Sequence, residues 1–387
     1  MYQNLSCRSI GATTTLKQNY DVVIAGGGPA GSMAALEASK AGLRVCLLDK
    51  VSRIGNKVRC GEAMSQKALE YFFKVNPKWV SKEIRYCKIN SPSGIQLKTE
   101  FKDDACLILD RKRFDYDLSV MAQNKGCEIF TNCLAKDLII KNNYVKGLVV
   151  EKDNREYRIN SKLVIAADGI ESRLGRKAGL RTQVKMKDMA SGIEYLVDDI
   201  DIDPNALDMY VGSEIAPGGY LWIFPKGEKS ANIGVAITGK HSGNRSAEKY
   251  LDDFISEKFP NSTIRRKLTG GIPVTKPIES PIKNGLVLVG DAARHINPLT
   301  GGGIAPAMKA GMYIGRMSAE IIDDPSEKRL SSYVKLIEQD FMKKHRVLYN
   351  IKEVISKLSD IDFNNIAQSI SKTPQEKLTL AKIFKSA

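Results

Sequence analysis

The chain contains 387 residues, 43% of them hydrophobic, which is enough apolar material for one large or two ordinary domains with buried cores. It has no apolar run of the roughly 18 residues that a membrane span needs. Residues 1–19, expected to be a flexible extension, lack the hydrophobic core of a secretory signal. The net charge of +15 comes without a nucleic-acid motif, which leaves a solvated basic face, an anionic membrane surface or acidic small substrates as explanations.

The seven cysteines are odd in number and show no paired spacing, and several lie in apolar stretches. This usage predicts a reducing, cytoplasmic environment without a disulfide framework. The sequence has no CxxC pair and no His/Cys cluster, so no metal site is expected. Of the three histidines, His295 is expected to be a loop residue without a role, and His241 and His345 are expected to lie on the surface.

The first expected element is an apolar strand over residues 21–25, followed at once by the pattern Gly26-x-Gly28-x-x-Gly31 and a helix over residues 32–41. In such a turn the glycines allow a tight bend, a close approach of the backbone to a pyrophosphate and close helix–strand packing. The free N–H groups at the helix start would face the phosphates. The pattern therefore predicts a dinucleotide site, with a glycine-rich turn that binds nothing as the alternative.

A second apolar strand, over residues 44–48, ends in Asp49. The separation from Gly31 is close to the roughly 20 residues expected for an acid that binds a ribose hydroxyl. This block supports the dinucleotide interpretation but does not distinguish NAD from FAD.

The elements that follow alternate between sheet and helix. Residues 84–101 predict a hairpin that turns at 91–94, residues 111–126 a helix, and residues 129–166 strands that turn near 142–143 and 153–154. Residues 185–275 are expected to be mostly strands, and the chain from Gly303 onward to be helical, with an amphipathic stretch over 331–358. This order predicts an antiparallel sheet inserted between pieces of a parallel-sheet domain.

A later strand, residues 287–289, ends in Gly290-Asp291, where a carboxylate can accept hydrogen bonds from a sugar-like polyol. A glycine-rich segment, residues 301–303, then leads into a helix rich in Ala and Gly. Backbone N–H groups at this second helix start would stabilise the negative charge of a reduced flavin, whereas NAD needs no such second site. The two features favour a flavin, with a flexible loop as the alternative interpretation of the glycines.

A third motif, Ala167-Asp168-Gly169 with Arg176, also follows a strand. With these three motifs in this order, the chain resembles the FAD proteins that include para-hydroxybenzoate hydroxylase. Residues 57–65 and 217–227 further resemble the geranylgeranyl reductase family, particularly its archaeal members, and the resemblance covers roughly residues 20–350. That family's Tyr-x-Trp-x-Phe-Pro motif is usually followed by Gly-x-Gly, whereas this chain has Gly234-Val235-Ala236.

The resemblance implies an α/β fold: an FAD-binding Rossmann-like domain of the glutathione-reductase type, an inserted antiparallel β-sheet substrate domain and a helical C-terminus. The expected ranges are 20–83, 105–180 and 276–325 for the FAD-binding domain, 84–104 and 181–275 for the substrate-binding domain, and 326–387 for the C-terminal helical region.

The resemblance also assigns roles to single residues. Those expected to hold FAD are Gly26, Gly28, Ala30 and Gly31 at the pyrophosphate, Asp49 at the ribose, Arg59, Cys60, Gly61 and Glu62 along the flavin and its tail, Arg111, Ala135 at the adenine end, and Asp291, Gly303 and Ile304 at the ribityl chain and isoalloxazine. Those expected to line a lipid tunnel are Tyr220, Trp222, Phe224 and Pro225. As alternatives, Arg111 could be a surface residue, Trp222 and Phe224 plain core, and Cys60 a small buried hydrophobe.

The implied activity is FAD-dependent saturation of the C=C bonds of geranylgeranyl chains in archaeal 2,3-bis-O-geranylgeranylglycerophospholipids, which gives archaeol-type lipids. Cys60, or a water held by Glu62, is the candidate catalytic proton relay. Expected partners are the prenylated glycerophospholipid, an external electron donor such as ferredoxin or NADPH, and an anionic membrane touched peripherally from the cytoplasm. The alternatives are an FAD monooxygenase or halogenase of the same fold, and a non-catalytic prenyl-lipid carrier.

Overall fold

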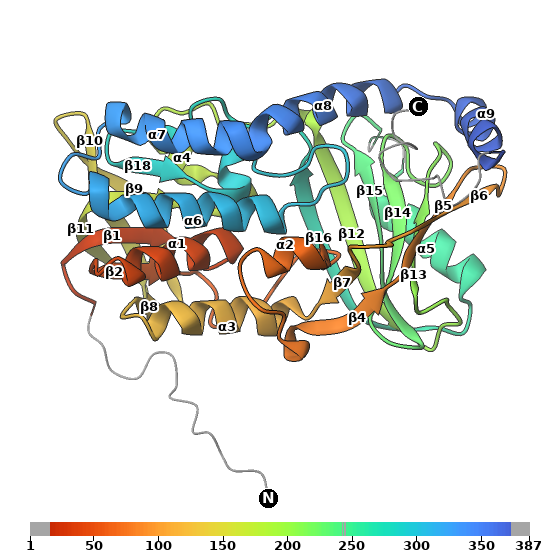
Figure 1. Ribbon diagram of the computed structural model, residues 1–387, viewed down its shortest axis with the longest axis horizontal. Coiled ribbons are helices and arrows are strands. Elements are labelled where there is room, and N and C mark those ends of the chain that lie inside the picture. Colours follow the sequence, from red (N-terminus) through yellow and green to blue (C-terminus); the bar gives the residue numbers. More distant parts are fainter. Residues whose placement is uncertain (1–15, 242, 244, 373–387) are drawn as a thin grey trace, which may run out of the picture.

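The computed structural model describes residues 16–241, 243 and 245–372. Two large sheets dominate it, each covered by helices on its outer side (Figure 1). The extension predicted over residues 1–19 lies almost wholly outside the described residues, and the first strand, β1, begins at Asn19. The last part of the expected C-terminal region, residues 373–387, also lies outside them.

The first sheet has a parallel core in the order β18, β11, β1, β2, β8. Its strands are β1 (Asn19–Ala25), β2 (Val45–Leu48), β8 (Glu128–Phe130), β11 (Arg155–Ala166) and β18 (Leu286–Leu288). They are short apolar runs where they pair, because a parallel strand is buried on both faces. The antiparallel additions are the hairpin β9 (Cys133–Lys141) and β10 (Tyr144–Lys152), which extends β11, and β17 (Ile282–Lys283).

Helices α1 (Pro29–Lys40), α3 (Arg111–Gln123) and α6 (Ile304–Ile321) cover one face of this sheet. Glycines let α6 lie unusually close to α1, since a Cβ at Gly311 would stand 2.1 Å from the carbonyl oxygen of Ala30, and one at Gly315 would stand 2.7 Å from that of Ala34. The matching order of these pairs means that the two helices run in the same direction. Helix α6 therefore starts about two turns ahead of α1.

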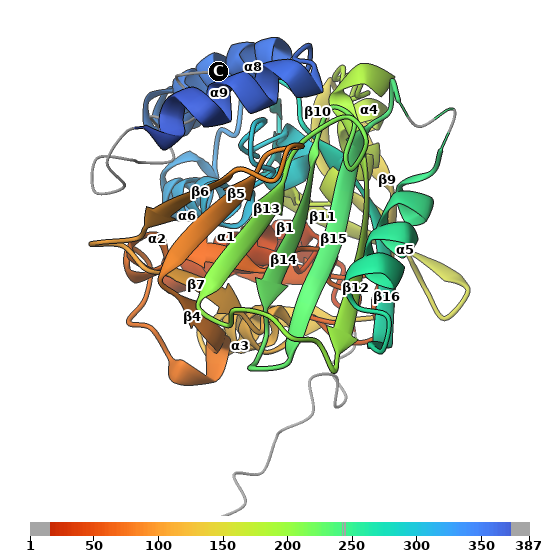
Figure 2. The same cartoon turned by 90° about the vertical axis from the view of Figure 1, so that its right-hand side faces the viewer.

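The second sheet has seven strands in the order β16, β12, β15, β14, β13, β5, β6 (Figure 2). They are β5 (Tyr86–Asn90), β6 (Gln96–Glu100), β12 (Met189–Asp198), β13 (Ala206–Tyr210), β14 (Tyr220–Pro225), β15 (Ser230–Thr238) and β16 (Thr263–Pro273). The inserted sheet is confirmed, with one difference: β5 and β13 run parallel, because the hairpin enters from a distant part of the chain. The α/β fold class is therefore confirmed, while the exact domain limits remain a prediction.

The remaining elements connect and cover these sheets. A small sheet of β3 (Ala63–Ser65), β7 (Cys106–Leu109) and β4 (Val80–Ile84), with helix α2 (Gln66–Glu70), lies between them. Helix α4 (Arg173–Lys177) follows β11. The C-terminal helices are α7 (Glu327–Ile337), a π-helical turn (Glu338–Met342), α8 (Lys343–Ile355) and α9 (Asp360–Ser371). Within the described part of the chain, no helix is long and apolar enough to cross a membrane.

Helix α5 (Ala247–Lys258) was not foreseen inside the strand-rich stretch 185–275. It begins at Ser246, whose side chain accepts a hydrogen bond from the N–H of Lys249, and it buries Leu251 and Ile255 against the outer face of the second sheet. A serine cap followed by apolar residues four apart is the local signal that could have predicted it.

The histidine predictions need one correction. His345 is not on the surface: it is buried, and its ring lies 5.3 Å from that of Phe341. The ring of His295 lies 5.2 Å from that of the same phenylalanine, and His295 is fully buried. Burial lowers the pKa of His295 to about 3 and that of His345 to about 4, so both rings are neutral at physiological pH. The amphipathic pattern of the sequence did not indicate the burial of His345, because the π-helical turn before α8 changes which residues face inward.

The pairing of Trp222 with Gly234 across β14 and β15 generates a stability prediction. A Cβ at Gly234 would stand 2.2 Å from Cζ2 of the indole, so Gly234→Ala must displace a buried ring. We expect the free energy of unfolding to fall by about 1–3 kcal/mol, as overpacking a core typically costs, measured by denaturant unfolding.

The matched control for this prediction is Gly192→Ala on the neighbouring strand. The nearest atom to the added methyl group there would be Cδ1 of Ile272, at 3.3 Å, and this end of a flexible side chain can move. An equal loss in both variants would contradict the role of the indole.

Candidate functional site

The glycine turn after β1 has the backbone that its pattern predicts. Gly26 has φ +107°, and a Cβ at Gly31 would stand 1.9 Å from the carbonyl oxygen of Gly26, so neither position accepts a side chain. A Cβ at Gly28 would meet open space, and this residue begins α1 without any side-chain cap. The start of α1 is thus an open cradle with free N–H groups, which suits a phosphate.

Asp49 closes this turn from the next strand. Its carboxylate accepts hydrogen bonds from the N–H of Gly27 at 2.6 Å and from that of Val51 at 2.9 Å. The N–H of Cys133, at the start of β9, donates to the carbonyl oxygen of Asp49 at 2.8 Å, and Ala135 follows two residues later. The residues expected at the adenosine end of a dinucleotide therefore lie together.

A second uncapped helix start lies at Gly303, where α6 begins. The carboxylate oxygen Oδ1 of Asp291 lies 3.5 Å from the position that a Cβ of Gly303 would take, and the neighbouring Gly301 has φ +71°. Burial raises the pKa of Asp291 above its usual range, and the positive charge of Arg111 offsets only part of this rise. An acceptor for a polyol and free N–H groups for an anion therefore meet at one place, which fits the two chemical needs of FAD.

Arg111 is buried at the start of α3, not a surface residue. Its guanidinium donates to both carboxylate oxygens of Asp115, at 2.7 and 2.8 Å. Its charge also acts on Cys60. Burial raises the pKa of this thiol, Arg111 opposes the rise, and the resulting value is about 11. Arg111 therefore lies within electrostatic reach of both Cys60 and Asp291, which brings two distant sequence motifs into one site.

Glu62 is the centre of a buried polar network. It is 5% exposed, adopts φ +70°, and its carboxylate accepts from Nζ of Lys226 at 2.5 Å and from Nδ2 of Asn232 at 2.9 Å. Nζ of Lys226 also donates to the carbonyl oxygen of Leu109 at 2.9 Å. The network joins the small sheet to β14 and β15. The left-handed backbone conformation of Glu62 is a locally strained one for a residue with a side chain.

Three aromatic rings follow one face of β14. Tyr220, Trp222 and Phe224 alternate with residues of the outer face, and their ring centroids are 5.7 and 6.1 Å apart. A Cβ at Gly61 would stand 2.9 Å from Phe224 and 3.4 Å from Nε1 of Trp222, so only glycine fits beside these rings. We call these three side chains the aromatic stripe. Pro225 ends β14, opposite Ala231.

The aromatic stripe extends from Gly61 to an apolar pocket. Tyr220 lines this pocket, and its hydroxyl donates to the carbonyl oxygen of Thr300 at 2.6 Å, in the loop that leads to Gly303. Other apolar side chains of the lining are Ile89, Met209, Val211, Ala216, Leu299, Ile355, Leu358 and Phe363. Such a lining suits a hydrocarbon rather than a polar molecule.

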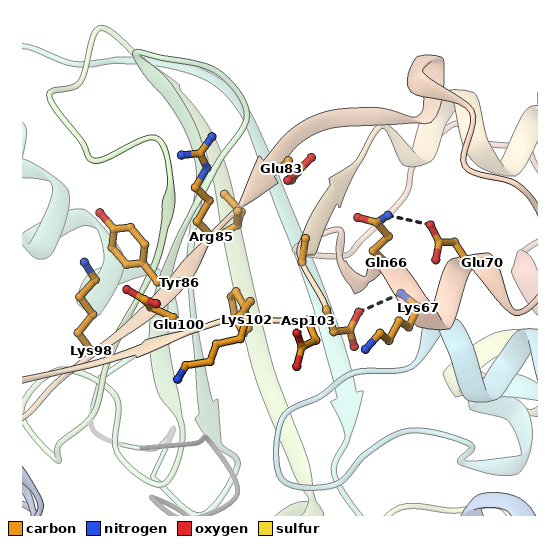
Figure 3. Close-up of a pocket in the computed structure, with 14 residues that line it drawn as sticks. Gln66, Lys67, Glu70, Glu83, Arg85, Tyr86, Lys98, Glu100, Lys102 and Asp103 are labelled. Carbon is orange, nitrogen blue, oxygen red and sulfur yellow. Dashed lines mark hydrogen bonds between the residues drawn. The ribbon is translucent and has the colours of Figure 1, made fainter. Parts of the chain in front are cut away.

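A second hollow differs in character. It lies between α2 and the start of the hairpin β5–β6, and Figure 3 shows charged side chains of both signs around it. Gln66 donates to Glu70 there at 2.7 Å. Its lining includes the cations Lys67, Arg85, Lys98 and Lys102 and the acids Glu70, Glu83, Glu100, Asp103 and Asp104, so neither sign of charge dominates.

One acid of the site was not predicted. Glu194, on β12, is 5% exposed, and its Oε2 accepts from Nε1 of Trp222 at 3.1 Å. Burial and the nearby negative charge of Glu62 raise its pKa to about 8. A lone acid between Ile193 and Tyr195 in an apolar strand was the available signal.

The remaining predicted residues lie around this centre. Ala30 and Ile304 occupy the first turns of α1 and α6. Arg59 is exposed, and its side chain lies 3.2 Å from the Cβ position of Gly270 on β16. It is therefore further from the buried centre than Cys60 and Glu62.

Comparison with known proteins agrees with this geometry. Residues 188–272 match the model of the geranylgeranyl reductase catalytic domain, and residues 21–216 match that of FAD dependent oxidoreductases. Digeranylgeranylglycerophospholipid reductase 1 of Methanococcoides burtonii is 40% identical over 96% of this chain and 93% of its own length. The corresponding reductase of Methanocella arvoryzae is 39% identical over 96% of each chain. The chain belongs to the geranylgeranyl reductase family.

Solved structures support the same assignment. A geranylgeranyl bacteriochlorophyll reductase-like protein from Thermoplasma acidophilum has 35% identity and a TM-score of 0.91, over 95% of this chain and 96% of its own. A flavin-dependent brominase, Bmp2, has a TM-score of 0.70 at 17% identity over 92% of this chain and all of its own, which shows a shared fold only. As a member of the geranylgeranyl reductase family, the chain is an FAD-dependent oxidoreductase.

The network at Glu62 generates a prediction. Lys226→Met removes the cation while Glu62 stays buried, so we expect the free energy of unfolding to fall by about 3–5 kcal/mol. The double variant Lys226→Met/Glu62→Gln, which removes both charges, should recover most of the loss in denaturant unfolding. Lys229→Met, at an exposed lysine nearby, is the control and should change little. A double variant as unstable as the single one would show that the charge pairing is not the cause.

Proposed function

We propose that this protein saturates the C=C bonds of the geranylgeranyl chains of a 2,3-bis-O-geranylgeranylglycerophospholipid, yielding archaeol-type membrane lipids. The names of the relatives support the substrate class. The observation that carries the proposal is the buried aromatic stripe, which connects an apolar pocket to Gly61, Cys60 and Glu62.

The residues that would hold FAD are those of the two open helix starts. Gly26, Gly28 and Gly31 with Asp49 suit the adenosine pyrophosphate, and Asp291 with Gly303 suits the ribityl chain and the flavin ring. When bound and reduced, FAD supplies the hydride equivalent. Arg111 adds the positive charge that stabilises an anion nearby.

An isolated trisubstituted alkene is not electrophilic, so it must receive a proton as well as hydride. Protonation of the less substituted carbon leaves positive charge on the tertiary carbon. Trp222 and Phe224 are 7% and 9% exposed, so the stripe excludes water from such a cation, and their ring faces stabilise it. We propose that Cys60 delivers the proton, with Glu62 fixing the segment that carries it through the bond from its N–H to Sγ at 3.3 Å.

The electron donor is proposed to be external, such as ferredoxin or NADPH. The substrate lies in a membrane, so we also propose a peripheral contact with an anionic bilayer from the cytoplasmic side. Two observations support the contact. The chain carries a net charge of +15, and the outer side of α8 and α9 exposes Val347, Val354 and Ile361 beside the apolar pocket.

The reaction is tested with the purified protein, which we expect to be yellow. Under anaerobic conditions with dithionite and geranylgeranyl phospholipid, mass spectrometry should show a gain of two hydrogens for each bond reduced. Asp291→Ala should lose flavin absorbance and the product together, because the polyol loses its acceptor. A colourless wild-type protein that binds prenyl lipid would favour a carrier, and incorporation of oxygen or halide would favour the other enzyme classes.

The membrane contact is tested by sedimentation with vesicles that contain anionic phospholipid. Binding should weaken as salt rises, since exposed charges are screened over about 8 Å at physiological ionic strength. Val354→Glu should weaken binding several-fold, because it places a charge where an apolar side chain meets the bilayer. Ile264→Glu, at an exposed residue of β16, is the control. Equal binding by wild type and Val354→Glu would place the contact elsewhere.

A further inference from the structure

The side chain of Glu194 lies directly beside the aromatic stripe. It leaves β12 on the same face of the sheet as Trp222, because Glu194 pairs with Gly234 and Gly234 pairs with Trp222. One carboxylate oxygen, Oε2, accepts from the indole N–H at 3.1 Å. Nε1 of Trp222 therefore lies close both to Gly61, whose Cβ position is 3.4 Å away, and to Glu194.

The other oxygen of Glu194 has no hydrogen-bond partner. Oε1 is buried, and so is Oδ1 of Asn232, which also has none. Asn232 lies two residues from Gly234 on the same face of β15, and its Nδ2 is held by Glu62. Each of these buried acceptors lacks a donor, and a buried acceptor without a donor is costly. A proton on Glu194 removes the cost of a buried, unpartnered carboxylate oxygen, because the neutral acid needs less solvation than the anion.

The charges around Glu194, together with its burial, favour the neutral carboxylic acid. Glu62, on the segment before β3, repels a second negative charge. The cations are Lys226, after β14, and Arg266, on β16. Lys226 already donates to Glu62 and to a carbonyl oxygen. Its positive charge is therefore largely balanced by Glu62 and stabilises a carboxylate at Glu194 only weakly. Cys60 is a neutral thiol at physiological pH, and the nearby Arg111 is paired with Asp115.

We propose that Glu194 is the proton reserve of the site: it is held as a neutral carboxylic acid beside the indole nitrogen of Trp222 and reprotonates Cys60 in each round of alkene reduction. This inference rests on the proposed function. Glu194 acts through Cys60, so it is a positioning and proton-supply residue rather than one that touches the alkene.

The proton balance is closed by one proton from solvent for each bond reduced. The S–H bond of Cys60 breaks as its proton forms a C–H bond with the π electrons of the alkene, which leaves a thiolate. The O–H bond of Glu194 then breaks and the S–H bond re-forms, which leaves a carboxylate. This transfer is downhill, because the pKa of Glu194 is about 8 and that of Cys60 about 11. Solvent returns the proton to Glu194 before the next round.

The protonation state can be tested in the resting, FAD-loaded protein without any turnover. Infrared difference spectra recorded across pH should show the C=O band of a neutral carboxylic acid at pH 7, lost near pH 8, and absent from Glu194→Gln. Because the chain has two tryptophans, a Trp79→Phe background lets the fluorescence of Trp222 report the same titration. A carboxylate at Glu194 already at pH 7, with no change in either signal up to pH 9, would overturn the proposal.

Turnover gives the second test. Loss of the acid form predicts that wild-type kcat falls about tenfold per pH unit above the titration. Glu194→Gln should lower kcat at pH 7 by roughly 100-fold, with little change in KM or flavin content and without that alkaline fall. Glu194→Asp should restore part of the rate. Glu257→Gln, at an exposed residue of α5, is the control.

The outcomes separate the two proposals. Normal turnover by Glu194→Gln, with a wild type that reduces geranylgeranyl chains, overturns the role of Glu194 alone. A wild type that reduces no geranylgeranyl lipid refutes the proposed function and the relay together. A low rate in Glu194→Gln that Glu194→Asp does not improve, with the alkaline fall retained, would show a purely structural role and also overturn the proposal.

Discussion

The close contact of Gly61 with the rings of Trp222 and Phe224 determines how the two halves of the molecule meet. Gly61 belongs to the segment between the parallel sheet and the small sheet, while the rings belong to the second sheet, so any Cβ at this position would force the halves apart. The ion pair of Glu62 with Lys226 lies next to this contact and fixes it from the polar side. Packing and electrostatics therefore act at the same point of the chain.

Two buried ion pairs lie close to this contact, while a third, Lys352 with Asp188, lies elsewhere in the described part of the chain. Arg111 with Asp115, and Glu62 with Lys226, are each paired, and each pair lies within reach of Cys60. A buried pair contributes little net stability, because desolvation offsets most of its attraction. Its value in this molecule is to fix the orientation of groups beside a buried apolar cluster, where a misplaced charge would be costly.

Much of the fold and half of the site could be predicted from local sequence. The turn at Gly26 to Gly31 and the carboxylate at Asp291 follow from short-range patterns, because their geometry needs specific residues within a few positions. Glu194, Asn232 and Lys226 could not be assigned in this way. They meet only through strand pairing, and a shift of one residue would have turned Glu194 to the opposite face of the sheet. The burial of His345 was missed for a related reason, since it depends on one π-helical turn and the ring of Phe341.

The hydroxyl of Tyr220 joins the wall of the apolar pocket to the loop before α6, through its hydrogen bond to Thr300. A ligand that shifts this ring must also shift the loop, and a molecule bound at the helix start must restrict the ring. For the proposed lipid and FAD this hydrogen bond would link binding at the two places, and such linkage is reciprocal: whatever factor a bound lipid contributes to cofactor affinity, the cofactor contributes to lipid affinity.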